Sequence, residues 1–289
     1  SFFSDIRYSD YALLNLVADA PDRTNLDKSL KRSNIKSLSV ALDDHAGGHH
    51  PRYVKRGIPY GEEDEIVDFV SLPVGLSNLT KLTSLSLGNC ALQNVDALAN
   101  CANLTSLELV GCDSLENVNF LANLTNLTDL TLSFRLADDQ WEGEDMEIVG
   151  ETSIKNIDGL NNCTKLTSLT MERSDFLFDL SNLSNLSNLT NLRLSECGIF
   201  DNVDGLSNLT NLTSLKLNWC DSLQNVDGLA NLTKLTSLDL GGCKALTLLP
   251  NKYKMTNRKQ VADYQKYIKK VITKKVTKNK RVAPDKAAN

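Results

Sequence analysis

The chain has 289 residues, of which 41% are hydrophobic and 23% are charged, and its formal net charge is −5. This balance is ordinary for a globular protein, and the absence of any run of eighteen apolar residues excludes a transmembrane helix. The charge is uneven: residues 251–289 carry thirteen Lys or Arg against Asp263 and Asp285, a net of +11, which leaves −16 on the remainder.

The first 34 residues lack the periodic pattern that follows them. Apolar residues recur at helical spacing in Asp10–Ala18, and Asn25–Arg32 can add a further turn. The open end of a repeat protein exposes a row of apolar residues. We therefore predict that residues 1–34 form a helical N-terminal cap. The sequence shows no signal peptide, although it begins at Ser1 rather than Met and a removed leader stays an alternative.

A repeated leucine pattern occupies residues 35–250. Each copy has apolar residues at its first, fourth and sixth places, and no copy can bury them alone. Side chains alternate along a strand, so these places predict eight parallel strands, from 35–40 to 235–240, with their apolar side chains facing inward. Most starts lie 22 or 23 residues apart, a period typical of stacked repeats. The copies start at Ile35, Leu82, Leu104, Leu127, Leu166, Leu189, Leu212 and Leu235.

Between the strands, apolar residues recur at every third place, as in Leu115, Val118 and Leu121. A spacing of three suits 3₁₀ turns better than α-helices. The pattern thus predicts an α/β repeat solenoid, with a parallel β-sheet on the concave face and short 3₁₀ or irregular turns on the convex side. Most copies have Asn four places and Thr two places before their start, and these side chains can bond to backbone groups where the chain bends. This structural role accounts for the many N-x-S/T sequons without glycosylation.

Two copies carry insertions directly after their strands. The first, near residues 45–68, contains all three histidines, His45, His49 and His50. With two nearby aspartates these could hold a transition metal, but two glycines interrupt them and a solvated loop is the interpretation we prefer. The second, near residues 134–150, places Trp141 among acidic residues without the ligand spacing of a calcium loop. Both should emerge on one edge of the solenoid, which is often the functional edge.

All seven cysteines occupy places of the repeat. Cys101 and Cys163 replace the leucine three residues before a start, and the other five take the ninth place: Cys90, Cys112, Cys197, Cys220 and Cys243. A disulfide network would not follow a stacking period, whereas buried free thiols acting as small hydrophobes explain all seven. None lies in a C-x-x-C pair or beside a histidine, which argues against a redox or catalytic role. Reduced thiols favour a cytoplasmic over a secreted location.

The strings LANLTNLT at Leu121–Thr128 and LTSLDL at Leu235–Leu240 resemble the short leucine-rich repeats of bacterial internalins and of their eukaryotic relatives in the phosphatase-regulator group. The resemblance covers about 35–250. Cysteine at the ninth place, where that family usually has asparagine, is instead similar to the cysteine-containing class of leucine-rich repeats. The resemblance implies a protein-interaction scaffold, and no catalytic residue carries over because the motif has none.

Beyond Pro250, Thr256–Lys275 is predicted to form a helix with Thr256 or Asn257 near its cap. One apolar stripe could close the open end of the solenoid, and it contains Val261, Tyr264, Ile268, Val271 and Ile272. The opposite face is basic, with Lys259, Lys266, Lys269, Lys270 and Lys274. The tail KKVTKNKRVAPDKAAN, from Lys274 to Asn289, is predicted to be disordered. Residues 251–289 therefore form a third region after the cap and the repeats.

An interaction scaffold is the function that we favour, because outward strand residues of stacked repeats form an extended binding surface. Most outward places hold Thr or Ser, but the C-terminal half also has Trp and Arg, which dominate interface energetics. The candidate partner-binding residues are Glu172, Arg173, Arg193, Glu196, Lys216, Trp219 and Asp239, with Trp141 from the second insertion. The sequence does not name the protein partner, and the alternative is that these residues are only solvated.

A second hypothesis is that residues 251–289 bind an anionic ligand, either nucleic acid or a membrane surface. No aromatic stacking platform or nucleic-acid motif accompanies them, so a solubilising role is the alternative. For an enzyme we find no nucleophile–base pair, P-loop or Gly-rich dinucleotide motif, and we expect neither catalysis nor a cofactor.

The cysteine pattern makes a direct prediction about covalent structure. A thiol reagent added to the chain denatured without reductant should modify all seven cysteines, because none is expected to be oxidised. Mass spectrometry of the modified chain counts the labels. An intrachain disulfide in the native protein would contradict the interpretation of the cysteines as buried free thiols.

Overall fold

The computed structural model describes residues 36–41, 76, 79–88, 95–112, 115, 117–134, 157–174, 179–197, 199–246 and 254–282. The predicted N-terminal cap, both insertions with their histidines and Trp141, and Cys90 lie outside the described residues. The chain divides into two compact units, Ser1–Phe176 and Leu177–Asn289. Each unit is a stack of rungs, a rung being one strand with the turns that follow it.

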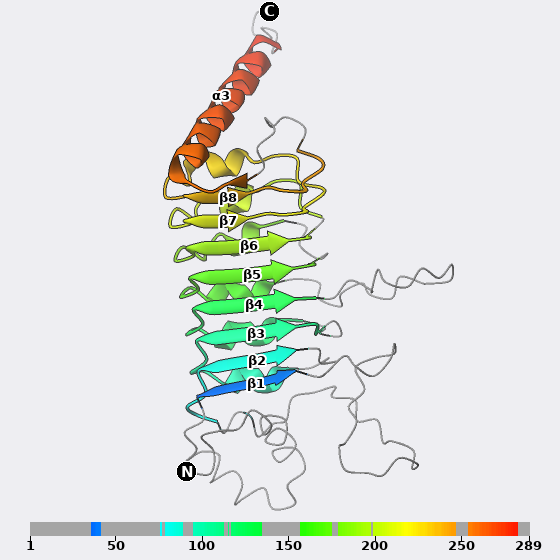
Figure 1. Ribbon diagram of the computed structural model, residues 1–289, viewed down its shortest axis with the longest axis vertical. Coiled ribbons are helices and arrows are strands. Elements are labelled where there is room, and N and C mark those ends of the chain that lie inside the picture. The colour runs from blue at the N-terminus through cyan, green and yellow to red at the C-terminus, as the bar shows by residue number, and fades with distance from the viewer. Residues whose placement is uncertain are drawn as a thin grey trace, which may run out of the picture. The chain divides into compact units, whose positions relative to one another are not determined.

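The first unit contains five parallel strands that pair in chain order (Figure 1). They are β1 (Ser37–Ala41), β2 (Ser84–Gly88), β3 (Ser106–Val110), β4 (Asp129–Ser133) and β5 (Ser168–Glu172). The register sets equivalent places of the repeat opposite one another, as with Leu85 and Leu107. The fourth- and sixth-place side chains described from β2 onward are buried, as predicted. A one-residue slip would turn every leucine to the other face, so the repeat itself fixes the register.

The second unit contains three parallel strands, and a short fourth strand is antiparallel to the last of them. The strands are β6 (Asn191–Ser195), β7 (Ser214–Lys216), β8 (Ser237–Asp239) and β9 (Lys254–Met255). The sequence did not predict β9. It pairs Met255 with Leu238, and the Met255 side chain is buried. β9 therefore occupies the edge of β8, where an unpaired strand would offer its backbone groups to another chain.

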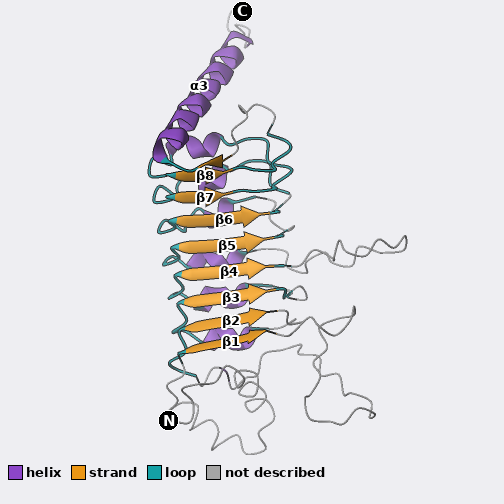
Figure 2. Ribbon diagram, viewed as in Figure 1, coloured by secondary structure: helices purple, strands orange, loops and turns teal. Residues whose placement is uncertain are grey.

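Short 3₁₀ turns lie behind the strands of each unit, as the spacing of three predicted (Figure 2). They are η2 (Asp96–Asn100), η3 (Asn119–Asn123), η4 (Asp158–Asn162), η5 (Ser181–Leu183), η6 (Asp204–Leu206) and η7 (Asp227–Asn231). Their leucines complete the core, and Leu98, Leu160 and Leu206 are fully buried. The parallel sheet and these turns confirm the repeat-solenoid class within each unit.

Each strand begins two residues later than predicted, because the first-place leucine belongs to the preceding turn. The N–H of Leu104 donates to the carbonyl of Cys101 at 3.0 Å, and the N–H of Leu127 donates to that of Leu124 at 3.1 Å. These are i to i−3 hydrogen bonds of the 3₁₀ type. The first leucine is still buried, but it closes a turn instead of extending the ladder of the sheet.

Asx side chains start several of the 3₁₀ turns. Asn117, Asp179, Asn202 and Asn225 each lie two residues before the first residue of η3, η5, η6 and η7, respectively, and their Oδ1 atoms accept the backbone N–H of that residue at 2.6–3.0 Å. Such Asx turns satisfy a donor that the short helix leaves unpaired. Asn and Asp therefore recur before the 3₁₀ turns because their side-chain oxygens accept this N–H.

Asparagine also links rungs, and in three described copies it does so from the place directly before the repeat start. Asn103, Asn126 and Asn211 donate through Nδ2 to a carbonyl of the preceding rung, at 2.6, 2.9 and 2.9 Å. Of the predicted ladder, Asn162 makes the corresponding bond to Ala122, at 3.2 Å. These amides of N-x-T sequons are engaged with the backbone, which agrees with a structural origin of the sequons.

The six described cysteines are free and buried, as predicted. Their thiols donate to backbone carbonyls: Cys220 Sγ lies 3.4 Å from the oxygen of Leu194, and Cys243 Sγ lies 2.8 Å from that of Leu217. Both acceptors are the sixth-place leucine of the rung before. Burial raises the pKa of Cys101 and of Cys163 to about 11, which keeps these thiols protonated at neutral pH.

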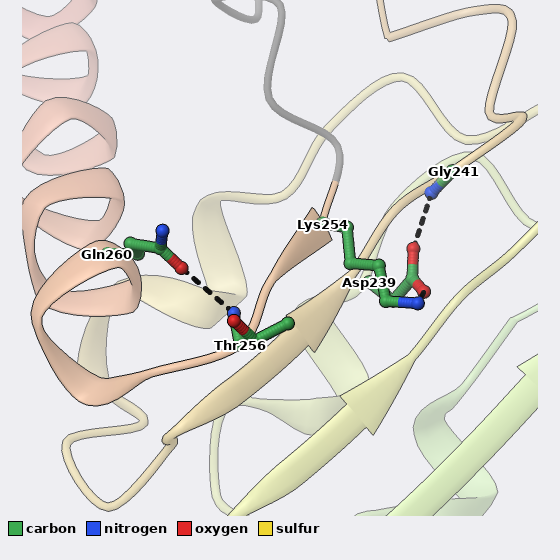
Figure 3. Close-up of polar contacts among 5 residues, drawn as sticks. All are labelled: Asp239, Gly241, Lys254, Thr256 and Gln260. Carbon is green, nitrogen blue, oxygen red and sulfur yellow. Dashed lines mark hydrogen bonds and ion pairs between the residues drawn. The ribbon is translucent and has the colours of Figure 1, made fainter.

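The C-terminal helix α3 (Arg258–Val282) caps the second unit. Asn257 Oδ1 accepts the N–H of Gln260 at 3.0 Å. Gln260 Oε1 accepts the N–H of Thr256, also at 3.0 Å (Figure 3). This reciprocal pair is close to a capping box. Val261, Tyr264 and Ile268 are buried, which confirms the core of the predicted stripe. Burial also raises the pKa of the Tyr264 hydroxyl.

A buried glutamine on α3 closes the last 3₁₀ turn, and no pattern in the sequence indicated it. The side chain of Gln265 is 8% exposed. Its Nε2 donates to the carbonyls of Leu229 and Leu232, at 2.9 Å each. These carbonyls belong to η7 and its C-cap. At the equivalent places of an inner rung, Leu121 and Leu124, the donor is the thiol of Cys163 from the next rung, at 3.3 and 3.9 Å. Gln265 therefore supplies at the end of the repeat the donor that a further rung would provide.

The prediction of a disordered tail from Lys274 is wrong for Lys274–Val282, which is helical. Nucleation is the costly step of helix formation, and it is already complete in the packed first turns of α3. Lys and Arg are good helix formers, so the helix continues through them. It ends two residues before Pro284, and the residue preceding a proline is disfavoured in helical conformation. No helix in the described part of the chain is long and apolar enough to cross a membrane.

The Gln265 contact predicts a specific loss of stability. Gln265→Ala would remove one of two donors from each of the carbonyls of Leu229 and Leu232, which keep their backbone donors. The loss of two hydrogen bonds should cost about 1–3 kcal/mol. The control is Lys266→Ala, on the exposed neighbour, which should stay within about 0.5 kcal/mol of wild type. Urea unfolding monitored by circular dichroism measures both. Equal stability of the two variants would show that Gln265 does not cap η7.

Candidate functional site

Charged side chains from four adjacent strands of the second unit form a row on the outward face of the sheet. The register pairs Arg193 of β6 with Lys216 of β7, Lys216 with Asp239 of β8, and Asp239 with Lys254 of β9. Arg193 and Lys254 are exposed, while Lys216 and Asp239 are half-buried. The structure thus brings three predicted site residues together and adds Lys254, which carries a positive charge to the edge of the sheet.

Asp239 is held in place by two neighbours (Figure 3). Its Oδ1 accepts the backbone N–H of Gly241 at 3.1 Å, and its Oδ2 lies 3.9 Å from Lys254 Nζ. The lysine side chain is 71% exposed, so this ion pair contributes little to stability. Asp239 is therefore mainly a local turn residue, and the row presents the cations Arg193 and Lys216 beyond it.

The eighth place of the repeat, one to three residues past the strand, has a left-handed backbone in five rungs, although not at Phe134. The φ angles are 56° at Arg173, 57° at Glu196 and 59° at Trp219, and glycine takes the same place at Gly111 and Gly242. In this conformation the Cβ of an L-residue crowds the backbone, which costs roughly 1–2 kcal/mol. Three of the predicted site residues thus stand where glycine would be more favourable.

Trp219 lies over Gly242 of the next rung. A Cβ atom built on Gly242 would collide with indole ring atoms of Trp219, which places the ring against the glycine backbone. The tryptophan is nevertheless 57% exposed, the largest exposed fraction among the exposed large hydrophobic residues described. Its backbone N–H donates to the carbonyl of Gly241 at 2.7 Å, so the residue is fixed to the next rung. Trp219 is therefore a positioned aromatic surface.

The remaining predicted residues lie as follows. Glu196 occupies the eighth place of the rung before Trp219 and is half-buried. Glu172 and Arg173 belong to the first unit, at the end of β5 and directly after it. Glu172 Oε2 accepts a long hydrogen bond from Ser133 Oγ, at 3.4 Å. Trp141 and the histidines lie outside the described residues, and within the described part of the chain no cluster of His, Cys, Asp and Glu could hold a metal ion.

No family model matches the chain, and no curated protein matches it. Similar solved structures include the internalin InlF of Listeria monocytogenes, with 24% identity, coverage of 73% of this chain and 54% of that one, and a TM-score of 0.48. This chain thus spans about half the length of InlF.

Two further solved structures are similar at comparable levels. Internalin C2 of Listeria monocytogenes is 23% identical, with coverage of 77% of this chain and 93% of that one and a TM-score of 0.46. The leucine-rich repeat domain of the type III effector XopL is 17% identical, with 86% of each chain covered and a TM-score of 0.48. The fold assignment itself depends on the 23-residue frame, the parallel strands and the 3₁₀ turns of this chain. The chain has a leucine-rich repeat fold.

Two features of the site were not predicted. The left-handed eighth place had a signal in the sequence, since Gly111 and Gly242 occupy it in two repeats. A place that alternates between glycine and polar or aromatic residues indicates positive φ. For Lys254 the sequence contained no such signal, because this residue lies outside the leucine repeat, on a two-residue strand.

The contact between Trp219 and Gly242 can be tested with a double-mutant cycle. Gly242→Ala should destabilise the chain by more than about 1 kcal/mol, because the new Cβ adds the positive-φ cost to the collision with the indole. In the Trp219→Ala background only the positive-φ cost remains, so the two substitutions should couple by about 0.5–3 kcal/mol. Gly241→Ala, where no indole atom lies near the added Cβ, is the control and should show no coupling. Additive effects at Gly242 would contradict the contact.

Proposed function

We propose that this chain is a protein-interaction scaffold that binds a partner through the outward face of its sheet and its inserted edge, without chemistry of its own. Trp219 is the proposed anchor. The single observation that carries the proposal is an aromatic side chain that is 57% exposed although its backbone is fixed to the next rung. Tryptophan is enriched among residues that dominate binding energy.

The backbone at Trp219 supports a functional origin of this residue. The left-handed conformation at the eighth place does not need tryptophan, since glycine adopts it at Gly111 and Gly242. Proteins tend to keep such locally unfavourable residues where function requires them. Burial of the exposed indole by a partner would offset the free-energy cost of the unfavourable backbone at Trp219.

The cations beside Trp219 favour a partner with an acidic contact surface. Arg193 and Lys216 lie opposite one another on adjacent strands. Exposed charges at a rim act mainly on the rate of association and on orientation. Trp219 would thus supply most of the affinity, and Arg193 and Lys216 would steer the encounter. Glu172, Arg173 and Glu196 are proposed as supporting contacts, and Trp141 as a contact of the inserted edge.

Truncation of the anchor should weaken capture of the partner. Proteins that the full-length chain retains from its host extract are compared with those retained by Trp219→Ala, by quantitative mass spectrometry, and the Kd of the candidate is then measured with purified proteins. Loss of a buried tryptophan anchor costs ~2 kcal/mol or more, whereas loss of an exposed charge such as Arg193 costs ~0–1 kcal/mol.

Tyr267→Ala is the matched control, because Tyr267 is a second exposed aromatic residue, 39% exposed on α3. It should leave the affinity for the partner unchanged. If Trp219→Ala and Arg193→Ala both bind the purified partner with wild-type affinity, the outward face of the second unit is not the binding surface.

A further inference from the structure

The C-terminal half of α3 is strongly basic and regularly helical. From Tyr264 to Val282 the helix carries eight Lys or Arg and no acidic residue; the basic residues are Lys266, Lys269, Lys270, Lys274, Lys275, Lys278, Lys280 and Arg281. The first four of these are exposed. A single acidic residue, Asp263, precedes them in the helix. An uncompensated density of charge this high attracts a polyanion.

The cap of the solenoid does not need this half of the helix. α3 contacts η7, β8 and β9, and its buried side chains run from Val261 to Ile268. Val271 and Ile272 are half-buried. Figure 1 shows the later turns of α3 continuing beyond the strands of this unit. The segment that closes the core is thus the first part of the helix, and the basic residues described beyond Ile268, which are Lys269, Lys270 and Lys274, are exposed.

The distribution of residue types around the helix disfavours a membrane surface as the ligand. A helix that lies in the membrane interface needs a wide apolar face, with residues such as Trp, Phe or Leu. After Ile272 the only apolar residues of α3 are Val276 and Val282. They are six positions apart, which at 3.6 residues per turn places them on different sides of the helix. The earlier apolar residues Ile268, Val271 and Ile272 continue the capping stripe and are buried or half-buried, so they do not form a wide exposed apolar face.

The same segment fits duplex DNA better than single strands or duplex RNA. Proteins that bind single strands stack successive bases on several aromatic side chains, whereas Lys266–Val282 has one aromatic residue, Tyr267. The major groove of B-form DNA is wide enough for an α-helix, whereas that of A-form RNA is too narrow. Lys266–Val282 is about 25 Å long at 1.5 Å per residue, most of one turn of the duplex. We propose that the C-terminal half of α3 binds the phosphate backbone of duplex DNA, without sequence specificity.

The test measures binding of the full-length chain to a short fluorescent DNA duplex, by anisotropy, between about 50 and 200 mM salt. The expected Kd is about 10⁻⁴–10⁻⁶ M at physiological salt, as for non-specific binding. The variant changes Lys266, Lys269, Lys270 and Lys274 to Gln, a residue that preserves helix propensity. Each lost phosphate contact reduces the slope of log K against log salt by about 0.9, so the quadruple variant should lose about 3 to 4 units of slope.

The matched control changes four other exposed lysines to Gln, Lys36, Lys81, Lys165 and Lys234, which removes the same charge from the rungs. Its slope and affinity should stay close to wild type, and both variants should melt near the wild-type temperature. Equal salt slopes in the wild-type chain and the α3 variant would overturn the proposal. A loss of slope in the control variant as large as that in the α3 variant would also overturn it. Tighter binding of phosphatidylserine-containing vesicles or of polyglutamate than of the duplex at the same salt would overturn it too.

Discussion

Within each unit, the carbonyl of the second-place residue, usually threonine, joins one rung to the next. The oxygen of Thr83 accepts from the N–H of Thr105 at 2.8 Å, from the N–H of Ser106 at 3.0 Å and from Thr105 Oγ1 at 3.1 Å. The arrangement recurs from Thr105 to Thr128 and from Thr213 to Thr236. A carbonyl has two lone pairs and tolerates several donors. The threonine hydroxyl thus reinforces the ladder at the place where the sheet begins.

This dependence on neighbours makes the ends of a stack its weak points. A rung satisfies its backbone and buries its leucines only when another rung lies beside it. At the C-terminal end of the second unit three unrelated devices replace the missing rung: β9 pairs with β8, the apolar stripe of α3 covers the leucines, and Gln265 bonds to the last turn. The cap is thus specified residue by residue, whereas the repeat is specified by its period.

The repeat explains which parts of the structure could be predicted from the sequence. Leucines at fixed places indicate each strand, its register and its buried face, and a spacing of three indicates the 3₁₀ turns. These features can be predicted because the buried positions of an element recur with its period. The helix boundary at Val282 was missed because composition suggested disorder while a packed first half had already nucleated the helix.

The candidate site was only partly predictable. Its residue types, Trp219, Arg193 and Lys216, were visible because they depart from the Thr and Ser that fill most outward places. The unfavourable backbone beneath Trp219 and its contact with Gly242 depend on how two rungs meet, 23 residues apart. Lys254 reaches Asp239 only through a strand too short to leave a pattern. Contacts of this kind are set by geometry between elements and not by the period of either.

The central claim is that the outward face around Trp219 is covered by a protein when the chain functions. The most direct measurement is a structure of the full-length chain bound to the partner that it captures. The indole of Trp219, 57% exposed in the free chain, should be buried against the partner, with Arg193 and Lys216 at the rim of the contact. A complex in which Trp219 keeps its solvent exposure while the partner sits elsewhere would contradict it.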